Sequence, residues 1–206
     1  VNPVLREGNS DRRVADPVKD YARKNPHSMG AWTKESKCHV AHMTDKDFFG
    51  SEKSVVVEKA GSVKIVHVDK AGKETVLKDK LQLEAAEVID AATMNRNALR
   101  AFIDEQIADA KAKGVLFSVH LKATMMKVSD PIMFGHVVSV FFKDVYEKHA
   151  ETFKTLGISP NNGLGELYEK IATLPADKQD EIKKDIEKVY AARPELAMVN
   201  SDKGIT

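Results

Sequence analysis

Apolar and polar residues alternate with a short period between residues 53 and 83. Three short runs, 55–57, 63–68 and 75–77, are rich in β-branched residues, and such residues favour strands. The Asp-Lys-Ala-Gly-Lys sequence at 69–73 has the composition of a hairpin connection. The pattern predicts a small antiparallel sheet or ribbon whose alternating charged residues form a solvent-exposed face. We find no candidate catalytic or ligand-binding residues in it.

From residue 95 the apolar period lengthens to that of a helix. Leu99, Phe102, Ile103 and Ile107 fall on one face, and Gly114 is placed as a helix-ending glycine. Asp130-Pro131 is a helix start, and the wide apolar stripe that follows predicts a substantially buried helix. Three further helices are expected: one over 16–24, one through 164–171, and one ending at Arg193-Pro194.

A strand, a polar turn and a helix follow one another between residues 116 and 141. In a strand over 116–121, Phe117, Val119 and Leu121 share one face, while His120 and Lys122 share the other. Lys122 therefore falls at the carboxyl end of a strand, where α/β proteins place ligand-binding groups. With a further strand expected from residue 196, the order of elements predicts an α/β fold. Its helices would pack on a mixed sheet, beside a small antiparallel β portion.

Composition narrows the class of protein. The chain has 206 residues, of which 42% are hydrophobic and 31% charged, with a net charge of +1. These hydrophobic and charged fractions are typical of a globular domain. A net charge so close to zero produces no positive electrostatic field that would attract nucleic acid or an anionic membrane. Cys38 is the single cysteine, so an internal disulfide is excluded and a reducing cytoplasm is expected. No apolar run has the length of a membrane span.

The first thirteen residues form an arginine-rich loop. Arg6, Arg12 and Arg13 lie near Asn2, among turn-forming residues. The planar guanidinium binds carboxylates or phosphates through two hydrogen bonds, so the cluster would suit a polyanionic small ligand. Taken alone, however, the spacing favours solvated charges balanced by neighbouring acids.

Two other stretches could carry chemistry. The Cys-His-Val-Ala-His sequence at 38–42 contains three zinc-ligand types, but its spacing fits no closed zinc site. A half-buried strand is the favoured interpretation. The glycines of 161–165 match no dinucleotide or P-loop fingerprint. His136, within an apolar stripe, is interpreted as a core histidine, with a site-facing role left open.

Several long runs closely resemble the monomeric type of NADP-dependent isocitrate dehydrogenase, and the similarity covers essentially the whole chain. The runs are Val-Leu-Arg-Glu-Gly-Asn-Ser-Asp-Arg-Arg (4–13), Met-Gly-Ala-Trp (29–32), Val-Ala-His-Met (40–43), His-Leu-Lys-Ala-Thr-Met-Met-Lys-Val-Ser-Asp-Pro-Ile-Met-Phe-Gly-His (120–136), Asn-Asn-Gly-Leu-Gly (161–165) and Asn-Ser-Asp-Lys-Gly-Ile-Thr (200–206). Because Val1 is not a translation start, we expect an internal segment of such an enzyme, from its large second domain.

The resemblance implies oxidation of isocitrate by NADP and decarboxylation to 2-oxoglutarate, assisted by Mg²⁺ or Mn²⁺. It implies that Asn2, Arg6 and Arg12 hold the substrate carboxylates and that Lys122 is catalytic, together with a tyrosine elsewhere. The ligands of the metal and of NADP would lie outside this segment, which alone would be inactive. The implied fold is isocitrate/isopropylmalate dehydrogenase-like.

Within the segment we expect a substrate-binding loop region (1–50), a β-rich part (51–90) and an α/β part carrying the lysine (91–206). Isocitrate, 2-oxoglutarate and the remainder of the parent chain are the expected partners, with no nucleic acid or membrane. The alternative hypothesis is a non-catalytic anion-binding or assembly module derived from that enzyme.

Overall fold

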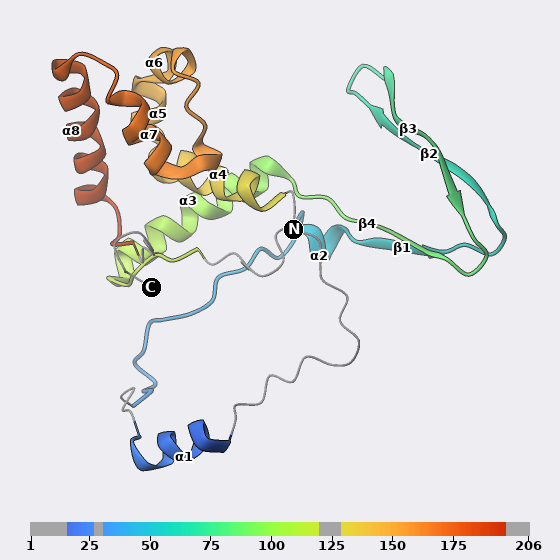
Figure 1. The fold of residues 1–206 in the computed structure, drawn as a ribbon, viewed down its shortest axis with the longest axis horizontal. Helices are drawn as coiled ribbons and strands as arrows, with labels where there is room; N and C mark the ends of the chain where they lie inside the picture. Colours follow the sequence, from blue (N-terminus) through green and yellow to red (C-terminus); the bar gives the residue numbers. More distant parts are fainter. Residues whose placement is uncertain (1–15, 27–30, 120–128, 197–206) are drawn as a thin grey trace. The chain divides into compact units, whose positions relative to one another are not determined.

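The computed structural model of the chain describes residues 16–26, 31–119 and 129–196 (Figure 1). Two compact units divide the chain: Ala41–Phe102 forms one, and residues 1–40 together with 103–206 form the other. The first is mainly β and the second mainly helical. The coarse class of helices with small antiparallel sheets is as predicted.

The β unit consists of a short helix and two antiparallel strand pairs. Helix α2 (Phe48–Ser51) is capped by Asp47, whose carboxylate accepts a 2.8 Å hydrogen bond from the Gly50 amide. Strand β1 (Lys53–Val56) pairs with β4 (Val88–Ala91). Between them, β2 (Gly61–Val68) pairs with β3 (Glu74–Leu83), the hairpin that the sequence predicted. Strand β4 was not predicted.

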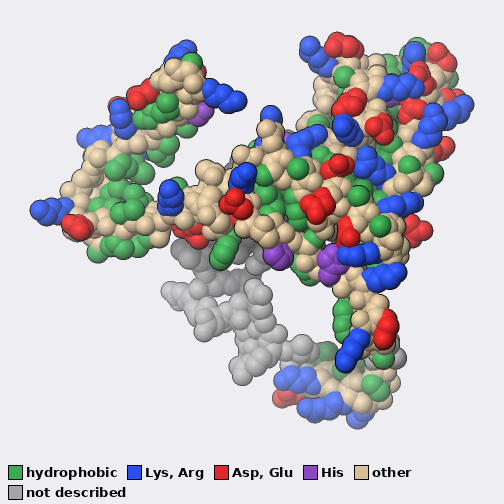
Figure 2. All heavy atoms as spheres, turned by 180° about the vertical axis from the view of Figure 1, so that it is seen from behind, with side chains coloured by type: hydrophobic (Ala, Val, Ile, Leu, Met, Phe, Trp, Pro, Cys, Tyr) green, Lys and Arg blue, Asp and Glu red, His purple; other side chains and the backbone are tan. Residues whose placement is uncertain are grey.

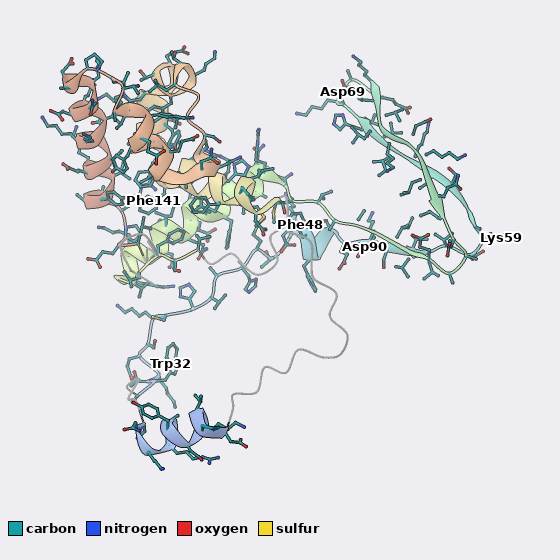
Figure 3. All side chains as sticks on the ribbon, in the orientation of Figure 1. Trp32, Phe48, Lys59, Asp69, Asp90 and Phe141 are labelled. Atoms are coloured by element: carbon teal, nitrogen blue, oxygen red, sulfur yellow. The ribbon has the colours of Figure 1, made fainter. Side chains whose placement is uncertain are left out.

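Local chemistry sets the turn of the β2–β3 hairpin. The Asp69 carboxylate accepts hydrogen bonds from the amides of Ala71 (2.8 Å) and Lys73 (2.9 Å). Gly72 takes a φ of 82°, a conformation that glycine adopts at little cost. Figure 3 labels Asp69 at the tip of this hairpin. Strand β3 has 10 residues against 8 in β2, so the register shifts, with bulges that increase twist.

Helix α3 (Arg96–Lys113) confirms the predicted change of period. The Asn95 side chain accepts a 3.0 Å hydrogen bond from the Ala98 amide at its start. Its buried face consists of Leu99, Ile103, Ile107 and Ala110. Gly114 follows with a φ of 67° and ends the helix as expected.

After residue 128 the helical unit contains five α-helices and one 3-10 turn. They are α4 (Ser129–Phe141), α5 (Lys143–Lys148), α6 (Ala150–Thr155), η1 (Pro160–Asn162), α7 (Gly163–Ile171) and α8 (Ala176–Ala192). Their fully buried side chains are Phe141, Leu167, Ile171, Ile182, Ile186 and Val145. Figure 3 labels Phe141 within this unit. The helices therefore form the core by packing on one another.

The expected helix following Asp130 is broken where it was predicted to continue. It ends at Phe141, and the chain bends at Phe142 and again at His149, which separates α5 from α6. Its first turns are also less buried than expected, since Ile132 is 49% exposed. Helix α1 (Asp16–Lys24), in contrast, has the predicted bounds, with an Arg23–Asp20 ion pair of 2.9 Å on its surface.

Two predicted strands are not formed as expected. In the described part of 116–121, one parallel bridge joins Phe117 to Leu196, where the Phe117 amide donates to the Glu195 carbonyl at 2.8 Å. No mixed sheet is present among the described residues. Residues 38–42 form no strand, and Val40 is 91% exposed. Alternation gives a strand only where a partner pairs with its backbone groups.

Candidate functional site

The site residues predicted from the sequence lie outside the described residues. This applies to Asn2, Arg6, Arg12 and Lys122, and also to His120. The structure does describe what comes directly before and after the lysine-bearing segment 120–128. On one side is the Phe117–Leu196 bridge, and on the other is the start of α4 at Ser129.

An aromatic contact joins Phe117, which lies shortly before that segment, to the end of α4. The Phe117 ring stacks on Phe141, with 6.3 Å between centroids and 24° between planes. The Arg193 guanidinium lies over the Phe141 ring, 5.9 Å from its centroid, a cation–π arrangement. The Lys111 ammonium donates to the Arg193 carbonyl at 3.0 Å. The bridge is therefore tied to α3, α4 and the end of α8.

The first half of α4 is held by a very close approach to η1. A Cβ atom on Gly135 would lie 1.8 Å from the Asn161 Oδ1 atom and 3.0 Å from the Asn161 amide nitrogen. No side chain larger than hydrogen fits there without movement of one of the two elements. Gly163, at a φ of 73°, then turns the chain into α7 beside the Phe134 ring. Gly163 thus serves the turn and the packing on Phe134, whereas Gly165 is exposed with no atom within 4 Å of an added Cβ atom.

A Glu166–Lys170 ion pair also stabilises the loop that precedes α7. Glu166 accepts from the Ser159 amide at 3.0 Å and pairs with Lys170 at 2.8 Å. The Lys170 hydrogen bond, followed by that from Ser159, lowers the pKa of Glu166 to about 2. Lys170 also donates to the Gly157 carbonyl at 2.6 Å. His136 is half-buried and has an interaction partner, and its role remains a prediction.

One group of three potential metal ligands converges within the described part of the chain. His149, Glu181 and Asp185 each offer a ligand atom, and these atoms lie within 4.8 Å of one another. Asp185 already accepts from His149 Nε2 at 2.9 Å, and from the ammonium groups of Lys148 at 2.6 Å and Lys188 at 2.8 Å. Each oxygen of the Asp185 carboxylate is therefore already paired with an ammonium group.

Asp185 is the acceptor at the centre of this network. It is 9% exposed and lies on the apolar stripe of α8, between Ile182 and Ile186. The Lys148 and Lys188 hydrogen bonds hold its pKa far below the usual range for a carboxyl. Lys148 also pairs with Glu181 at 2.9 Å, and lowers the pKa of Glu181 to about 2. An acidic residue on an otherwise apolar helix face is the sequence signal that could have identified this network.

Tyr146 is the second unusual polar group of the helical unit. Its hydroxyl is buried without a hydrogen-bond partner among the described residues. Its ring packs edge-to-face on Phe153 at 5.2 Å. Burial raises the pKa of Tyr146 to about 12, with a further contribution from Glu166. A phenol with so high a pKa is poorly matched to proton transfer at neutral pH.

The zinc hypothesis for residues 38–42 gains no support. Cys38 is exposed. His39 is bonded through Nδ1 to the Lys37 carbonyl at 2.9 Å, and its Nε2 lies 3.4 Å from Asp109. His42 Nδ1 contacts the Met43 carbonyl at 3.0 Å. The three side chains do not appear as a convergent metal-ligand group within the described residues.

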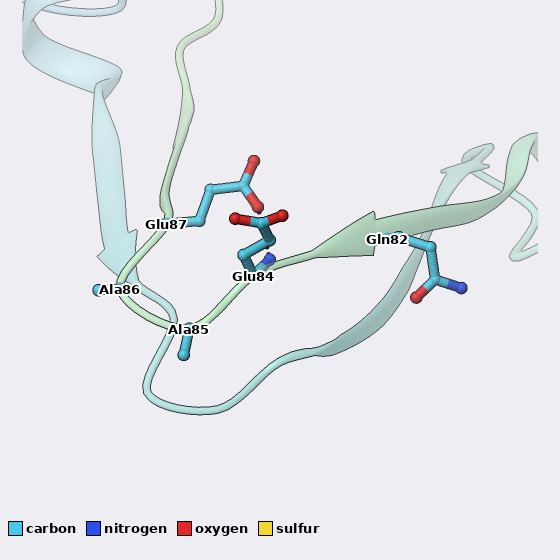
Figure 4. A pocket seen from close by; sticks show the side chains of 5 residues that line it. All are labelled: Gln82, Glu84, Ala85, Ala86 and Glu87. Atoms are coloured by element: carbon cyan, nitrogen blue, oxygen red, sulfur yellow. Dashed lines mark hydrogen bonds between the residues drawn. The ribbon is translucent and has the colours of Figure 1, made fainter.

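A shallow hollow of about 500 Å³ lies where β3 turns into β4 (Figure 4). It is lined by Gln82, Glu84, Ala85, Ala86 and Glu87, and the Glu87 carboxylate accepts from the Glu84 amide at 2.7 Å. Its lining side chains carry two carboxylates and no cation. Like charges repel at short range, so the hollow is unsuited to a tricarboxylate ligand.

The family model described as "Monomeric isocitrate dehydrogenase" matches residues 1–206. The chain belongs to this family. It is 63% identical, over all 206 residues, to the isocitrate dehydrogenase [NADP] of Azotobacter vinelandii. It is 62% and 52% identical, again over its full length, to the proteins named isocitrate dehydrogenase [NADP] 2 of Colwellia maris and Mycobacterium tuberculosis.

The chain spans 28% of the length of each of these relatives. The family resemblance inferred from the sequence runs is therefore confirmed. Among the described residues, no helix combines the length and apolar character needed to cross a membrane.

Proposed function

We propose that the chain is a segment of a longer NADP-dependent isocitrate dehydrogenase, and that this segment supplies substrate-carboxylate ligands and a catalytic lysine. The observation that supports it most is the family match, which extends over every residue. Identity to the Azotobacter vinelandii isocitrate dehydrogenase [NADP] is 63% over the same 206 residues. The parent would act in the cytoplasm as a monomer, in keeping with the family's name.

Substrate binding is assigned to the arginine-rich loop. Arg6 and Arg12 supply permanently charged, forked donors, and Asn2 supplies an amide. Three carboxylates on one small molecule call for such donors, since a guanidinium binds a carboxylate bidentately. The family membership makes this assignment preferable to the alternative of solvated surface charges.

Lys122 is assigned the proton-transfer role in the proposed reaction. A positioned ammonium can donate a proton to the enolate after carbon dioxide leaves. This assignment is supported by the fixed positions of the described residues that precede and follow the segment 120–128. Phe117 is fixed by its stacking on Phe141, and α4 is fixed by the contact between Gly135 and Asn161.

Mg²⁺ or Mn²⁺ would act as a Lewis acid on the substrate oxygens, and NADP would accept the hydride. The described residues do not form a fitting metal site, because Lys148 and Lys188 already neutralise Asp185. Hard divalent cations prefer several oxygen ligands. Following the family resemblance, we assign the metal and cofactor ligands to polypeptide beyond this segment. The proposed fold of the parent is isocitrate/isopropylmalate dehydrogenase-like, with the divisions 1–50, 51–90 and 91–206 inside the segment.

Lys122→Met in the complete parent protein tests the proposed role of the lysine. We expect the isocitrate dissociation constant, measured by calorimetry, to change by no more than a few-fold. Turnover should fall by about 10²–10⁴, the usual contribution of a general acid or base. Lys73→Met makes the same chemical change at an exposed hairpin position and should leave both quantities unchanged. Wild-type turnover in Lys122→Met would refute the catalytic assignment.

The second candidate is a non-catalytic anion-binding or assembly module that keeps the arginine loop. It predicts isocitrate binding without NADP reduction in the complete parent, even with Mn²⁺ present. The same titration, followed by an assay of absorbance from NADPH, separates the two hypotheses.

A further inference from the structure

The β2–β3 hairpin exposes an unusual amount of apolar side chain. Green side chains gather along it in Figure 2. The exposed fractions are 39% for Val63, 48% for Ile65, 56% for Val68, 49% for Val76 and 66% for Leu77. One face of these strands was expected to be charged and solvent-exposed, but both faces carry apolar residues. Exposed apolar surface of this kind marks an interaction site.

The apolar residues fall into two groups on opposite faces. Successive side chains of a strand point to opposite sides, so Val63 and Ile65 lie on one face of β2, and Val66 and Val68 lie on the other. Cross-strand partners share a face: Leu81 pairs with Val63, and Val76 with Val66. A hairpin that merely lay on a surface would need apolar residues on one face alone.

The β unit buries too little to account for these residues. Throughout Ala41–Phe102, all of which the structure describes, Leu83 and Leu99 are the buried residues. A two-stranded hairpin without a covering layer is only marginally stable in water. Valine and isoleucine in strands contribute mainly by packing against a neighbouring surface. The sequence of the hairpin therefore indicates a partner on each face.

We propose that the β2–β3 hairpin is an arm whose two faces are both covered, in the complete protein, by parts of the same polypeptide outside Ala41–Phe102. This inference rests on the proposed function, because it takes the parent to be a longer single chain. The relatives match the hairpin along with everything else, and the chain makes up 28% of their length. The family is described as monomeric, which favours cover from the same polypeptide over cover from a second copy.

Cysteine accessibility in the complete parent protein tests the proposal. Ile65→Cys reports on one face, Val68→Cys on the other, and Ala71→Cys on the hairpin tip, where the side chain is exposed. The other cysteines are replaced beforehand, and the three variants react with a maleimide in the native state and in urea. We expect Ile65→Cys and Val68→Cys to react at least tenfold more slowly than Ala71→Cys when native, and all three to react alike in urea.

Any other pattern of cysteine labelling overturns the proposal. Rapid reaction of both Ile65→Cys and Val68→Cys would show that neither face of the hairpin is covered. Rapid reaction of only one of them would show that the hairpin lies on a surface with one face exposed. Protection that weakens on dilution, with a dimer in sedimentation velocity, identifies a second copy as the cover. NADP reduction with isocitrate is assayed on the same preparations before labelling. Protection without activity would refute the proposed function and leave the covered arm standing, whereas activity without protection would do the reverse.

Discussion

Gly135→Ala tests the close contact that holds α4 against η1. The added methyl group would lie 1.8 Å from Asn161 Oδ1 and 3.0 Å from the Asn161 amide nitrogen. The side-chain oxygen can rotate away, but the backbone nitrogen cannot move without moving η1. Overpacking of this kind costs about 1–3 kcal/mol, offset by about 1 kcal/mol from replacing a helical glycine with alanine. Because the new methyl group would meet backbone as well as side-chain atoms of Asn161, the cost should lie in the upper part of this range, at about 2–3 kcal/mol. We therefore expect a net loss of about 1–2 kcal/mol in local stability.

Gly165→Ala is the matched control, because it makes the same change in α7 at an exposed glycine with no atom within 4 Å of the new Cβ. It should stabilise its helix by about 0.5–1 kcal/mol. Hydrogen–deuterium exchange with mass spectrometry, on the complete parent protein, reports local stability in each helix. Peptides from α4 and η1 should exchange about 5–30-fold faster in Gly135→Ala, and peptides from α7 more slowly in Gly165→Ala.

A double variant decides whether the Asn161 contact is the cause. Asn161→Ala removes the side-chain amide, whose oxygen would lie 1.8 Å from the new methyl group, and should recover part of the protection lost in Gly135→Ala. Recovery is incomplete because the backbone nitrogen, 3.0 Å from the new methyl group, remains. Such non-additivity is the signature of a direct contact. Wild-type exchange in Gly135→Ala, or additive losses in the double variant, would refute the reasoning.

Two further predictions concern acidic residues with structural roles. Asp185→Asn removes the negative charge to which three donors bond and should destabilise the α5–α8 contact by about 2–4 kcal/mol. The loss should be measured as faster amide hydrogen exchange in both helices. Exchange as slow as in the wild type would contradict the structural role assigned to Asp185. Because the pKa of Asp185 is lowered in the folded protein, its stabilising effect is complete above the ordinary carboxyl pKa. That effect should be lost progressively below about pH 4, and a pH series should show additional opening in the wild type that Asp185→Asn lacks. Asp69→Ala removes the acceptor for the Ala71 and Lys73 amides and should weaken the hairpin by about 1–2 kcal/mol. Asp79→Ala makes the same change within β3, away from the turn, and should leave the turn amides protected. Equal exchange in the two variants would show that the turn does not depend on the Asp69 side chain.

Features governed by local chemistry were predictable from the sequence. The end of α3 at Gly114, the hairpin turn at Asp69 and the bounds of α1 follow from residues close together in the chain. Family membership was also accessible, because it depends on long runs of specific residues.

Features that depend on distant partners were not predictable. Residues 38–42 alternate as a strand does, yet none of the strands that the structure describes pairs with them. The strand expected at 116–121 is reduced, in its described part, to a bridge with Leu196. The contact of Gly135 with Asn161 joins residues from separate elements, and no local sequence pattern predicts such a contact. The candidate site itself, at Asn2, Arg6, Arg12 and Lys122, lies outside the described residues, so its geometry remains a prediction.

The nested pairing of the β unit has a consequence for how it folds. Val68 pairs with Glu74 directly across the Asp69 turn, whereas Lys53 at the base pairs with Ala91. Closing the inner pairs loses little chain entropy, and each closed pair shortens the loop that the next pair must close. The strands can thus zip from the tip toward the base. The β1–β4 ladder is then the last to form and the first to open, so opening of the β unit should begin at β1–β4 while the β2–β3 hairpin is still paired.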